Sequence, residues 1–118
     1  MMEGEVSVAS MVESVVGCKW SVALLLQVSA GPQRPSALLR ANPGLSAKVM
    51  NERLRKLTRF GIVRRTVTGT KPPVEVEYSM TPLGDRFAGL LDDVRRLQQA
   101  VDDGEVEIPE PMELRTDA

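Results

Sequence analysis

The sequence predicts a mainly α-helical protein with one small antiparallel β-hairpin. Two observations lead to this fold class. Five segments carry apolar residues in patterns typical of helices, and two short runs rich in β-branched residues flank a loop that contains Gly and Pro. A chain of 118 residues suits one domain. Aromatic residues make up only 3%, so Leu, Val, Ala and Met must build the core. A core this small is often completed by dimerisation.

Two helices are predicted in the N-terminal part of the chain. The segment 7–16 has apolar residues at helical spacing, and Gly17 ends it. The segment 19–30 is apolar nearly all round, which is typical of a buried central helix. The pair Gly31-Pro32 stops this second helix.

A short helix and a longer one follow, joined by a tight Pro-Gly turn. The short helix covers 35–42, and the longer one covers 47–60. Ser46 is the predicted N-cap of the longer helix, and Gly61 stands at its C′ position. Together these segments predict a helix-turn-helix.

The C-terminal half holds a hairpin and a final helix. The strands are expected over 62–68 and 74–80, with a short loop or wing between them. Thr81 can cap the final helix, which has a proline at its first position. The apolar residues of that helix have an average spacing of about 3.5, the coiled-coil period, which predicts a dimer seam. They are Leu83, Phe87, Leu90, Val94, Leu97 and Val101.

The domain organisation follows from composition. Residues 7–101 form the predicted winged helix-turn-helix and dimerisation domain. Residues 102–118 contain seven acids, one Arg and two prolines, with few large apolar groups. Such a composition predicts an acidic, flexible tail.

Charge is strongly segregated along the chain. Between Arg34 and Lys71 there are ten basic residues and one acid, a net of +9. The rest of the chain has five basic and fifteen acidic residues, a net of −10. The whole-chain net charge of −1 hides this division. A surface so rich in cations is expected to meet a polyanion, most commonly the phosphates of a nucleic acid.

Several function classes are disfavoured by what the sequence lacks. It has no His and one Cys, which argues against a zinc site, an intrachain disulfide and His-assisted nucleophilic catalysis. No glycine-rich phosphate loop is present. We therefore expect no enzyme activity, no metal and no cofactor. No apolar run is long enough to span a membrane and no signal peptide is apparent, so a soluble, cytoplasmic protein is expected.

The predicted order of elements is that of a winged helix-turn-helix with a long terminal helix. The helix over 47–60 can lie in the major groove of double-stranded DNA, with the wing on a neighbouring phosphate. Asn51 and Arg55 are expected to read base edges, and Ser46 and Lys48 to hold phosphate. Glu52 would accept from a cytosine amine or orient a neighbouring cation. The full set of expected DNA contacts is Arg34, Ser46, Ala47, Lys48, Asn51, Glu52, Arg55, Arg64, Arg65 and Lys71.

Two other basic residues of the same helix receive a different prediction. Arg53 and Lys56 flank its inward face, so at least one of them is expected to pair locally. An alternative function is also open at this point. Winged helices serve as protein-interaction modules too, and the basic face could then dock an acidic protein partner.

A family resemblance rests on several separated motifs. They are G-x-K-W at Gly17–Trp20, Gly31-Pro32 with Arg34, Leu45-Ser46, L-R-x-L at Leu54–Leu57 with Gly61, and Pro72-Pro73 followed by Glu77–Thr81 and Gly84. In this order they resemble the HxlR family of bacterial winged-helix regulators, over about Ser7 to Leu97. The resemblance implies a homodimeric transcription factor on a palindromic operator, most simply a repressor. The terminal helices would build the dimer, with contacts from Val8, Met11, Val12, Trp20, Phe87, Leu90, Val94, Leu97 and Val101.

The single cysteine, Cys18, can be interpreted as a structural residue or as a redox sensor. Many relatives in the family that the chain resembles carry a redox-sensing cysteine near the start of the first helix, where this sequence has Ser7. Cys18 lies instead at a helix junction, where a small buried residue is the simpler interpretation. Its position beside Lys19 and near a helix start makes it a candidate redox sensor. The effector, whether a small molecule or an oxidant, is not specified by the sequence.

Overall fold

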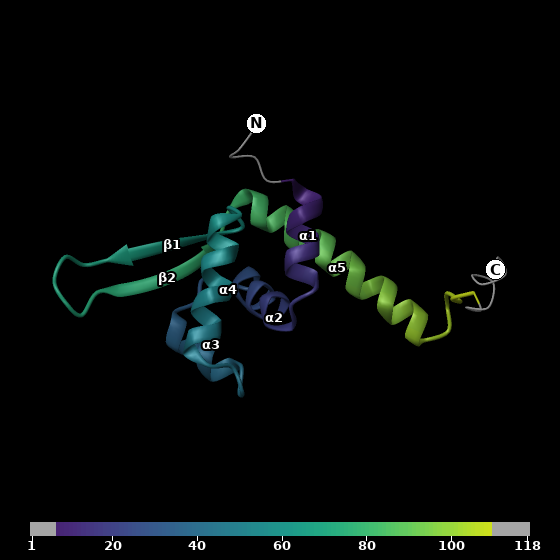
Figure 1. The fold of residues 1–118 in the computed structure, drawn as a ribbon, viewed down its shortest axis with the longest axis horizontal. Helices are drawn as coiled ribbons and strands as arrows, with labels where there is room; N and C mark the ends of the chain where they lie inside the picture. Colours follow the sequence, from purple (N-terminus) through teal and green to yellow (C-terminus); the bar gives the residue numbers. More distant parts are fainter. Residues whose placement is uncertain (1–6, 110–118) are drawn as a thin grey trace, which may run out of the picture.

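Residues 7–109 of the computed structural model form five helices and one two-stranded antiparallel sheet. The hairpin and the C-terminal half of the last helix project from the helical body in opposite directions (Figure 1). The predicted fold class is confirmed, and each predicted boundary differs from the observed one by at most two residues. In chain order the elements are α1 (Val8–Val16), α2 (Lys19–Ser29), α3 (Pro35–Ala41), α4 (Ala47–Arg59), β1 (Val63–Thr68), β2 (Glu75–Met80) and α5 (Pro82–Asp102).

The central helix is α2, as its nearly uniform apolar sequence predicts. It contacts α1, α4, α5 and β2. Its residues Leu24, Leu25 and Val28 are buried, and each neighbouring element adds apolar side chains to the same cluster. From α4 these are Met50, Leu54 and Leu57. Burial of such side chains is the main stabilising contribution, at about 1.5–3 kcal/mol for each large aliphatic residue.

The turn between α3 and α4 is held by a pair of amide side chains. Asn42 Nδ2 donates to Gln27 Oε1 at 2.8 Å, and Gln27 Nε2 donates to Asn42 Oδ1 at 3.1 Å. Asn42 Nδ2 also lies 2.7 Å from the Leu38 carbonyl oxygen, at the end of α3. Because Asn42 is buried, these bonds satisfy a polar group that would otherwise be costly. They fix α3 and the turn to the central helix.

Both ends of α4 follow the predicted capping chemistry. Ser46 Oγ accepts from the Val49 amide at 3.1 Å. At the other end Gly61 has a φ of +80°, a conformation that favours glycine. The Gly61 amide donates to the Thr58 carbonyl at 2.9 Å and the Ile62 amide to the Leu57 carbonyl at 3.0 Å. This is a Schellman motif, and it turns the chain directly into β1.

The hairpin pairs in regular register from Val63 opposite Met80 to Thr68 opposite Glu75. An additional bridge joins Gln33 to Tyr78 through reciprocal backbone hydrogen bonds of 2.9 and 2.8 Å. The segment before α3 is thereby tied to β2. This contact links the helix-turn-helix to the hairpin, and it has no signal in the sequence because it joins residues far apart in the chain.

The start of α5 packs against the residues that lead into β1. Thr81 Oγ1 accepts from the Gly84 amide at 2.9 Å and lies within hydrogen-bond distance of the Gly61 and Ile62 carbonyls. A Cβ at Gly84 would stand only 2.0 Å from the Ile62 carbonyl oxygen. Only glycine permits this approach. Further along the helix, Phe87 and Leu91 enter the core.

The structure places the end of α5 at Asp102, and residues 103–109 contain no helix or strand. The remainder of the predicted acidic tail, residues 110–118, lies outside the described residues. Within 7–109, no single helix is long and apolar enough to cross a membrane. The pair α1 and α2 passes that test only when taken together, by length and composition, with a bend of 108° between them.

Candidate nucleic-acid interface

The outward face of α4 carries the residues that the sequence assigns to DNA recognition. Lys48, Asn51, Glu52 and Arg55 are all exposed, while the opposite face of the helix is buried in the core. Ser46 and Ala47 are exposed at the N-terminus of the helix. The helix dipole adds positive potential at that end. The face is therefore free to meet a polyanion along its whole length.

A hollow of about 580 Å³ lies between α4 and the hairpin. Four of its lining residues come from α4, one from β1 and one from β2, namely Asn51, Arg55, Thr58, Arg59, Arg65 and Tyr78. Arg65 and Tyr78 are directly opposed in the β-ladder, so their side chains leave the same face of the hairpin. The structure thus places Arg65 of β1 beside Asn51 and Arg55 of α4. The sequence predicted these residues on separate elements, without indicating that they share one hollow.

The two remaining cations of the hairpin lie elsewhere. Arg64 is exposed on β1 and, by strand alternation, points to the face opposite Arg65. Lys71 is exposed in the loop that joins the strands. Neither lines the hollow.

Arg34 is engaged by a local partner. Its Nη2 lies 3.0 Å from Glu75 Oε1, across the base of the wing. Both side chains are more than half exposed, so the ion pair stabilises the fold by only about 0–1 kcal/mol and can open. Arg34 therefore contacts DNA only if this ion pair is broken or shared.

One expectation about α4 is wrong for the part of the chain that the structure describes. No ion pair within residues 7–109 involves Arg53 or Lys56, although one of them was expected to pair locally. The Nε of Arg53 is instead buried without a hydrogen-bond partner there. Glu52 makes no ion pair within residues 7–109, so of its two predicted roles the contact with a cytosine amine stays a prediction.

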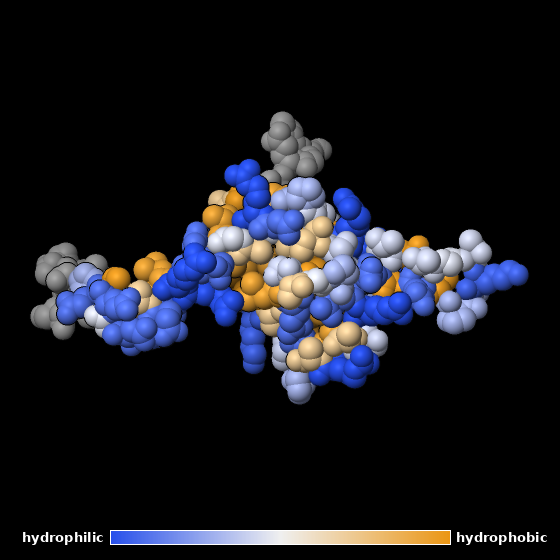
Figure 2. All heavy atoms as spheres, turned by 180° about the vertical axis from the view of Figure 1, so that it is seen from behind, coloured by the Kyte–Doolittle hydropathy of each residue, from blue (hydrophilic) through white to orange (hydrophobic). Residues whose placement is uncertain are grey.

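Most of the predicted dimer residues are exposed or half-buried. Val8, Leu90, Val94 and Leu97 are 46–60% exposed, and Val12, Trp20 and Val101 are half-buried. Val8, Leu83, Arg86, Phe87 and Leu90 line an apolar hollow of about 340 Å³ between α1 and α5. Apolar residues gather on the middle of the molecule, with hydrophilic ones over much of the projecting arms (Figure 2). We call the exposed residues Leu83, Leu90, Val94 and Leu97 the α5 seam.

Met11 and Phe87 differ from the other residues of the predicted dimer interface. They are 5% and 1% exposed and belong to the core of the protomer itself. At about 100° per residue, Phe87 and Leu91 share a face with Gly84, roughly a quarter turn from the α5 seam. The regular spacing of the apolar residues in α5 did not reveal this division, because spacing does not specify which neighbouring element covers which face of a helix.

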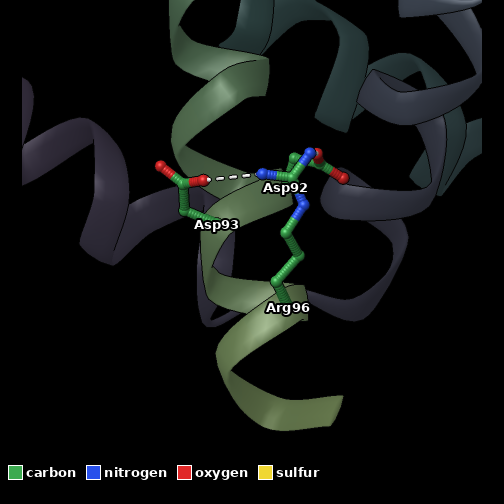
Figure 3. Close-up of polar contacts among 3 residues, drawn as sticks. All are labelled: Asp92, Asp93 and Arg96. Carbon is green, nitrogen blue, oxygen red and sulfur yellow. Dashed lines mark hydrogen bonds and ion pairs between the residues drawn. The ribbon is translucent and has the colours of Figure 1, made fainter. Parts of the chain in front are cut away.

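The polar side of α5 carries an ion-pair cluster (Figure 3). Arg96 Nη2 lies 2.7 Å from Asp92 Oδ2, and Arg96 Nη1 lies 3.3 Å from Asp93 Oδ1. The acids precede the base by four and three residues, the favourable order in a helix. These exposed pairs neutralise part of α5, which leaves no net basic face comparable with that of α4.

Within residues 7–109, no group of three or more His, Cys, Asp or Glu residues is placed to hold a metal ion. Cys18 is a free thiol of intermediate exposure at the N-cap of α2. Its side chain makes no capping hydrogen bond. Next to it, Lys19 Nζ lies 4.9 Å from the centroid of the Trp20 ring.

The fold and the basic face define a winged helix-turn-helix protein of the kind that binds DNA. Comparison with known proteins identifies the family. The pattern described as "HxlR-like helix-turn-helix" matches residues 15–104. The chain therefore belongs to the HxlR-like helix-turn-helix family, and it is a transcriptional regulator with a helix-turn-helix DNA-binding fold. The alternative of a protein-interaction module is not favoured by this membership.

Individual relatives agree with this assignment. The HTH-type transcriptional regulator YkvN of Bacillus subtilis (strain 168), described as uncharacterised, is 34% identical over 107 residues, which span 86% of this chain and 90% of YkvN. A regulator of Enterococcus faecalis V583 assigned to the MarR family superposes with a TM-score of 0.73 at 26% identity, covering 82% of this chain and 87% of that one. The reduced form of the regulator YodB from Bacillus subtilis gives 0.66 at 26% identity, covering 86% and 93%.

Sequence reasoning missed several residues that shape the interface. Arg59, Thr58 and Tyr78 line the hollow but were not assigned to the DNA face. The spacing of Asn51, Arg55, Thr58 and Arg59 along one helix face could have identified the α4 wall. Tyr78 carried no such signal, because it became part of the hollow only through its pairing with β1.

Proposed function

We propose that this protein acts as a homodimer that binds a palindromic operator sequence-specifically and represses transcription. The observation that carries the proposal is the uncompensated basic face of α4 and β1, which lies apart from the apolar α5 seam. One surface has the charge to bind DNA, and the other has the exposed apolar area that a second copy would cover. A compact dimer on an operator most simply blocks polymerase, hence repression.

In this proposal α4 enters the major groove with its N-terminal half against the bases. A helix of 13 residues is about 20 Å long, which suits the groove. Asn51 and Arg55 read adenine and guanine edges, whereas Ser46 and Lys48 hold phosphates. Arg64 and Lys71 place the wing on the neighbouring backbone. Because the target is chromosomal DNA, the protein would work in the cytoplasm of a bacterial cell.

Dimerisation is proposed through α5 with α1. Leu90, Val94 and Leu97 repeat at the coiled-coil period on one side of α5. They are too exposed to be explained by the protomer core. A two-fold symmetric dimer would present two copies of α4, and the separation of the half-sites would be one helical turn of DNA or a small multiple. We propose residues 7–101 as this functional unit, with residues 102–118 as an acidic extension.

The test combines a binding selection with one double variant. Genomic fragments are bound to the purified protein, enriched sequences are identified, and affinity is measured on the best duplex. Asn51→Ala with Arg55→Ala should remove sequence preference while sedimentation still reports the wild-type oligomer. Arg40→Ala, which removes an exposed cation from α3, is the matched control and should keep the preference. Absence of salt-sensitive binding to any fragment would reject the proposal.

Cys18 is the proposed position of any thiol-dependent control. The solved form of YodB called reduced belongs to that protein, but it motivates the same experiment here. Operator affinity is measured before and after diamide treatment, in wild type and in Cys18→Ser. A loss of affinity in wild type alone would support sensing. Equal affinities would assign Cys18 to a purely structural position at the α1–α2 junction.

A further inference from the structure

We propose that the hollow between α4 and the hairpin is a binding site for a small phosphorylated anion, and that such an anion competes with DNA. The second half of this proposal rests on the proposed function, and the first half does not. The hollow has a volume of about 580 Å³, within the range of small-molecule sites. Its walls come from three elements, so a ligand would be held from several directions rather than on a flat surface.

The lining is rich in hydrogen-bond donors and carries only positive charge. Arg55, Arg59 and Arg65 supply three guanidinium groups, each with five N–H donors and no acceptor. Asn51 adds an amide and Tyr78 a phenolic hydroxyl. Thr58 Oγ1 donates to the Leu54 carbonyl at 2.7 Å, so its hydroxyl proton is already used. No carboxylate lines the hollow, and a ligand must therefore bring acceptors and negative charge.

These arginines are not neutralised by the protein around them. Within residues 7–109, none of Arg55, Arg59 and Arg65 takes part in an ion pair. Arg34 and Arg96, in contrast, are paired with carboxylates. Three cations that line one hollow repel one another, and an anion between them would relieve that repulsion. The electrostatic attraction for an anion is therefore stronger in this hollow than at an isolated surface arginine.

The arrangement favours a phosphoryl group over a carboxylate. A phosphoryl group is tetrahedral and presents three oxygens toward three walls, here α4, β1 and β2. A carboxylate is planar and presents two oxygens in one plane. Guanidinium groups bind phosphate through paired N–H donors, and a dianion balances more of the three positive charges than a monoanion does. Inorganic diphosphate is the simplest probe of this chemistry.

Competition with DNA follows from shared residues. Asn51 and Arg55 line the hollow and are also the proposed base readers of α4. A bound anion would occupy their donors and lower the positive potential of the face. The anion and a duplex would then exclude each other, and the anion would act as an effector that releases the operator.

The first experiment needs no DNA. Diphosphate is titrated into the purified full-length protein by calorimetry at constant ionic strength, with inorganic phosphate as a weaker probe. Arg65→Gln should weaken diphosphate binding about tenfold or more, because it removes a charged hydrogen-bond partner. Arg64→Gln removes the same charge from the same strand but from its other face, and its affinity should stay within about twofold of wild type. Tyr78→Phe, which deletes only the hydroxyl, is a second variant of the site.

Equal diphosphate affinity in wild type and Arg65→Gln, or equal losses in Arg65→Gln and Arg64→Gln, would overturn the site. Both variants change exposed side chains, so circular dichroism and melting temperature should match those of wild type. A common loss with preserved folding would indicate general attraction to a basic surface. That outcome would leave the DNA-binding proposal intact.

The second experiment measures competition on the selected duplex. Diphosphate should weaken duplex binding by wild type more than KCl of equal ionic strength does. In Arg65→Gln the two salts should have the same effect. Diphosphate that binds the hollow without displacing DNA would overturn the competition. If no duplex is ever bound while Arg65-dependent diphosphate binding persists, the proposed function fails and the anion site stands.

Discussion

The two longest helices of this protein, α4 and α5, are both amphipathic, yet they use their faces differently. In α4 the apolar residues Met50, Leu54 and Leu57 are fully covered within the protomer, and the outward face is basic. In α5 only the N-terminal half is covered, through Phe87 and Leu91. Its exposed seam remains apolar, and on its polar side Arg96 pairs with Asp92 and Asp93.

The difference shows how an apolar stripe and a basic stripe lead to different partners. A helix whose apolar face is already buried has only its polar face left for function, and charge then selects the ligand. A helix that leaves Leu90, Val94 and Leu97 in water has unused apolar area, which a second protein surface would bury. The effect of salt distinguishes the two kinds of contact most directly.

The largest expected effect is therefore that of salt on the α4 face. If a dimer makes 6–10 phosphate contacts, duplex affinity should fall by about 10³–10⁵ between 50 and 200 mM salt. Association through the α5 seam should not weaken over the same range, because apolar burial is not screened. Fluorescence anisotropy measures the first quantity and analytical ultracentrifugation the second. Similar salt-dependent losses of duplex binding and of self-association would contradict this distinction between α4 and α5.

The next effect tests how α5 is anchored. Gly84→Ala should destabilise the fold by about 3 kcal/mol or more, since the new methyl group would meet the Ile62 carbonyl oxygen. Gly89→Ala is the matched control on the same helix, where a Cβ meets nothing within 4 Å. It should be neutral or stabilising by up to about 1 kcal/mol. Urea unfolding at several protein concentrations measures both. Similar values for the two variants would contradict the close packing at Gly84.

A charge in the α5 seam tests the proposed dimer. Leu97→Glu should weaken self-association about 10- to 100-fold, because burial of a leucine side chain is lost. Gln98→Glu adds the same charge at the neighbouring exposed position and should leave self-association close to wild type. Sedimentation velocity over a dilution series reports the change. A Leu97→Glu protein that remains dimeric would place the interface elsewhere.

The cap of α4 is expected to contribute less. Ser46→Ala removes the acceptor of the Val49 amide and should cost about 1 kcal/mol of unfolding free energy. Ser46→Asp should retain capping and therefore stability, so the pair separates capping from other causes. Thermal or urea unfolding gives the values. Equal stability of Ser46→Ala and wild type would mean that the α4 N-terminus is satisfied in another way.

The smallest effect is expected on the polar side of α5. Arg96→Ala breaks both ion pairs in Figure 3, but the side chains are exposed and the loss should be about 0.5 kcal/mol or less. It should shrink further at 1 M salt. A double-mutant cycle with Asp92→Ala isolates the pair. A coupling energy well above this value would show that the pair contributes more than an exposed ion pair usually does.

Much of the fold could be predicted because its signals are local. Ser46 and Thr81 cap the helices that follow them, and Gly61 ends α4 in the left-handed conformation. These signals depend on a residue and its near neighbours in the chain. The Gln27–Asn42 pair and the Gln33–Tyr78 bridge could not be predicted, because each joins segments with no pattern relating them.

The candidate site shows the same division. The concentration of cations between Arg34 and Lys71 indicated the polyanion-binding surface directly from composition. The hollow itself required β1 and β2 to place Arg65 and Tyr78 against the side of α4. Arg34 is predicted among the DNA contacts, but its pairing with Glu75 depends on the Gln33–Tyr78 bridge, which lays the segment before α3 along β2.

The sequence alone therefore determined the order of elements, their caps and the segregation of charge. The tertiary structure decided which half of the α5 stripe is core and which is free surface, because periodicity describes a helix but not the neighbours that cover it. It buried Phe87 and left Leu90 and Leu97 exposed, although all three belong to the same repeat. It also assembled the hollow from three elements, since contacts between distant segments arise only when the whole chain packs.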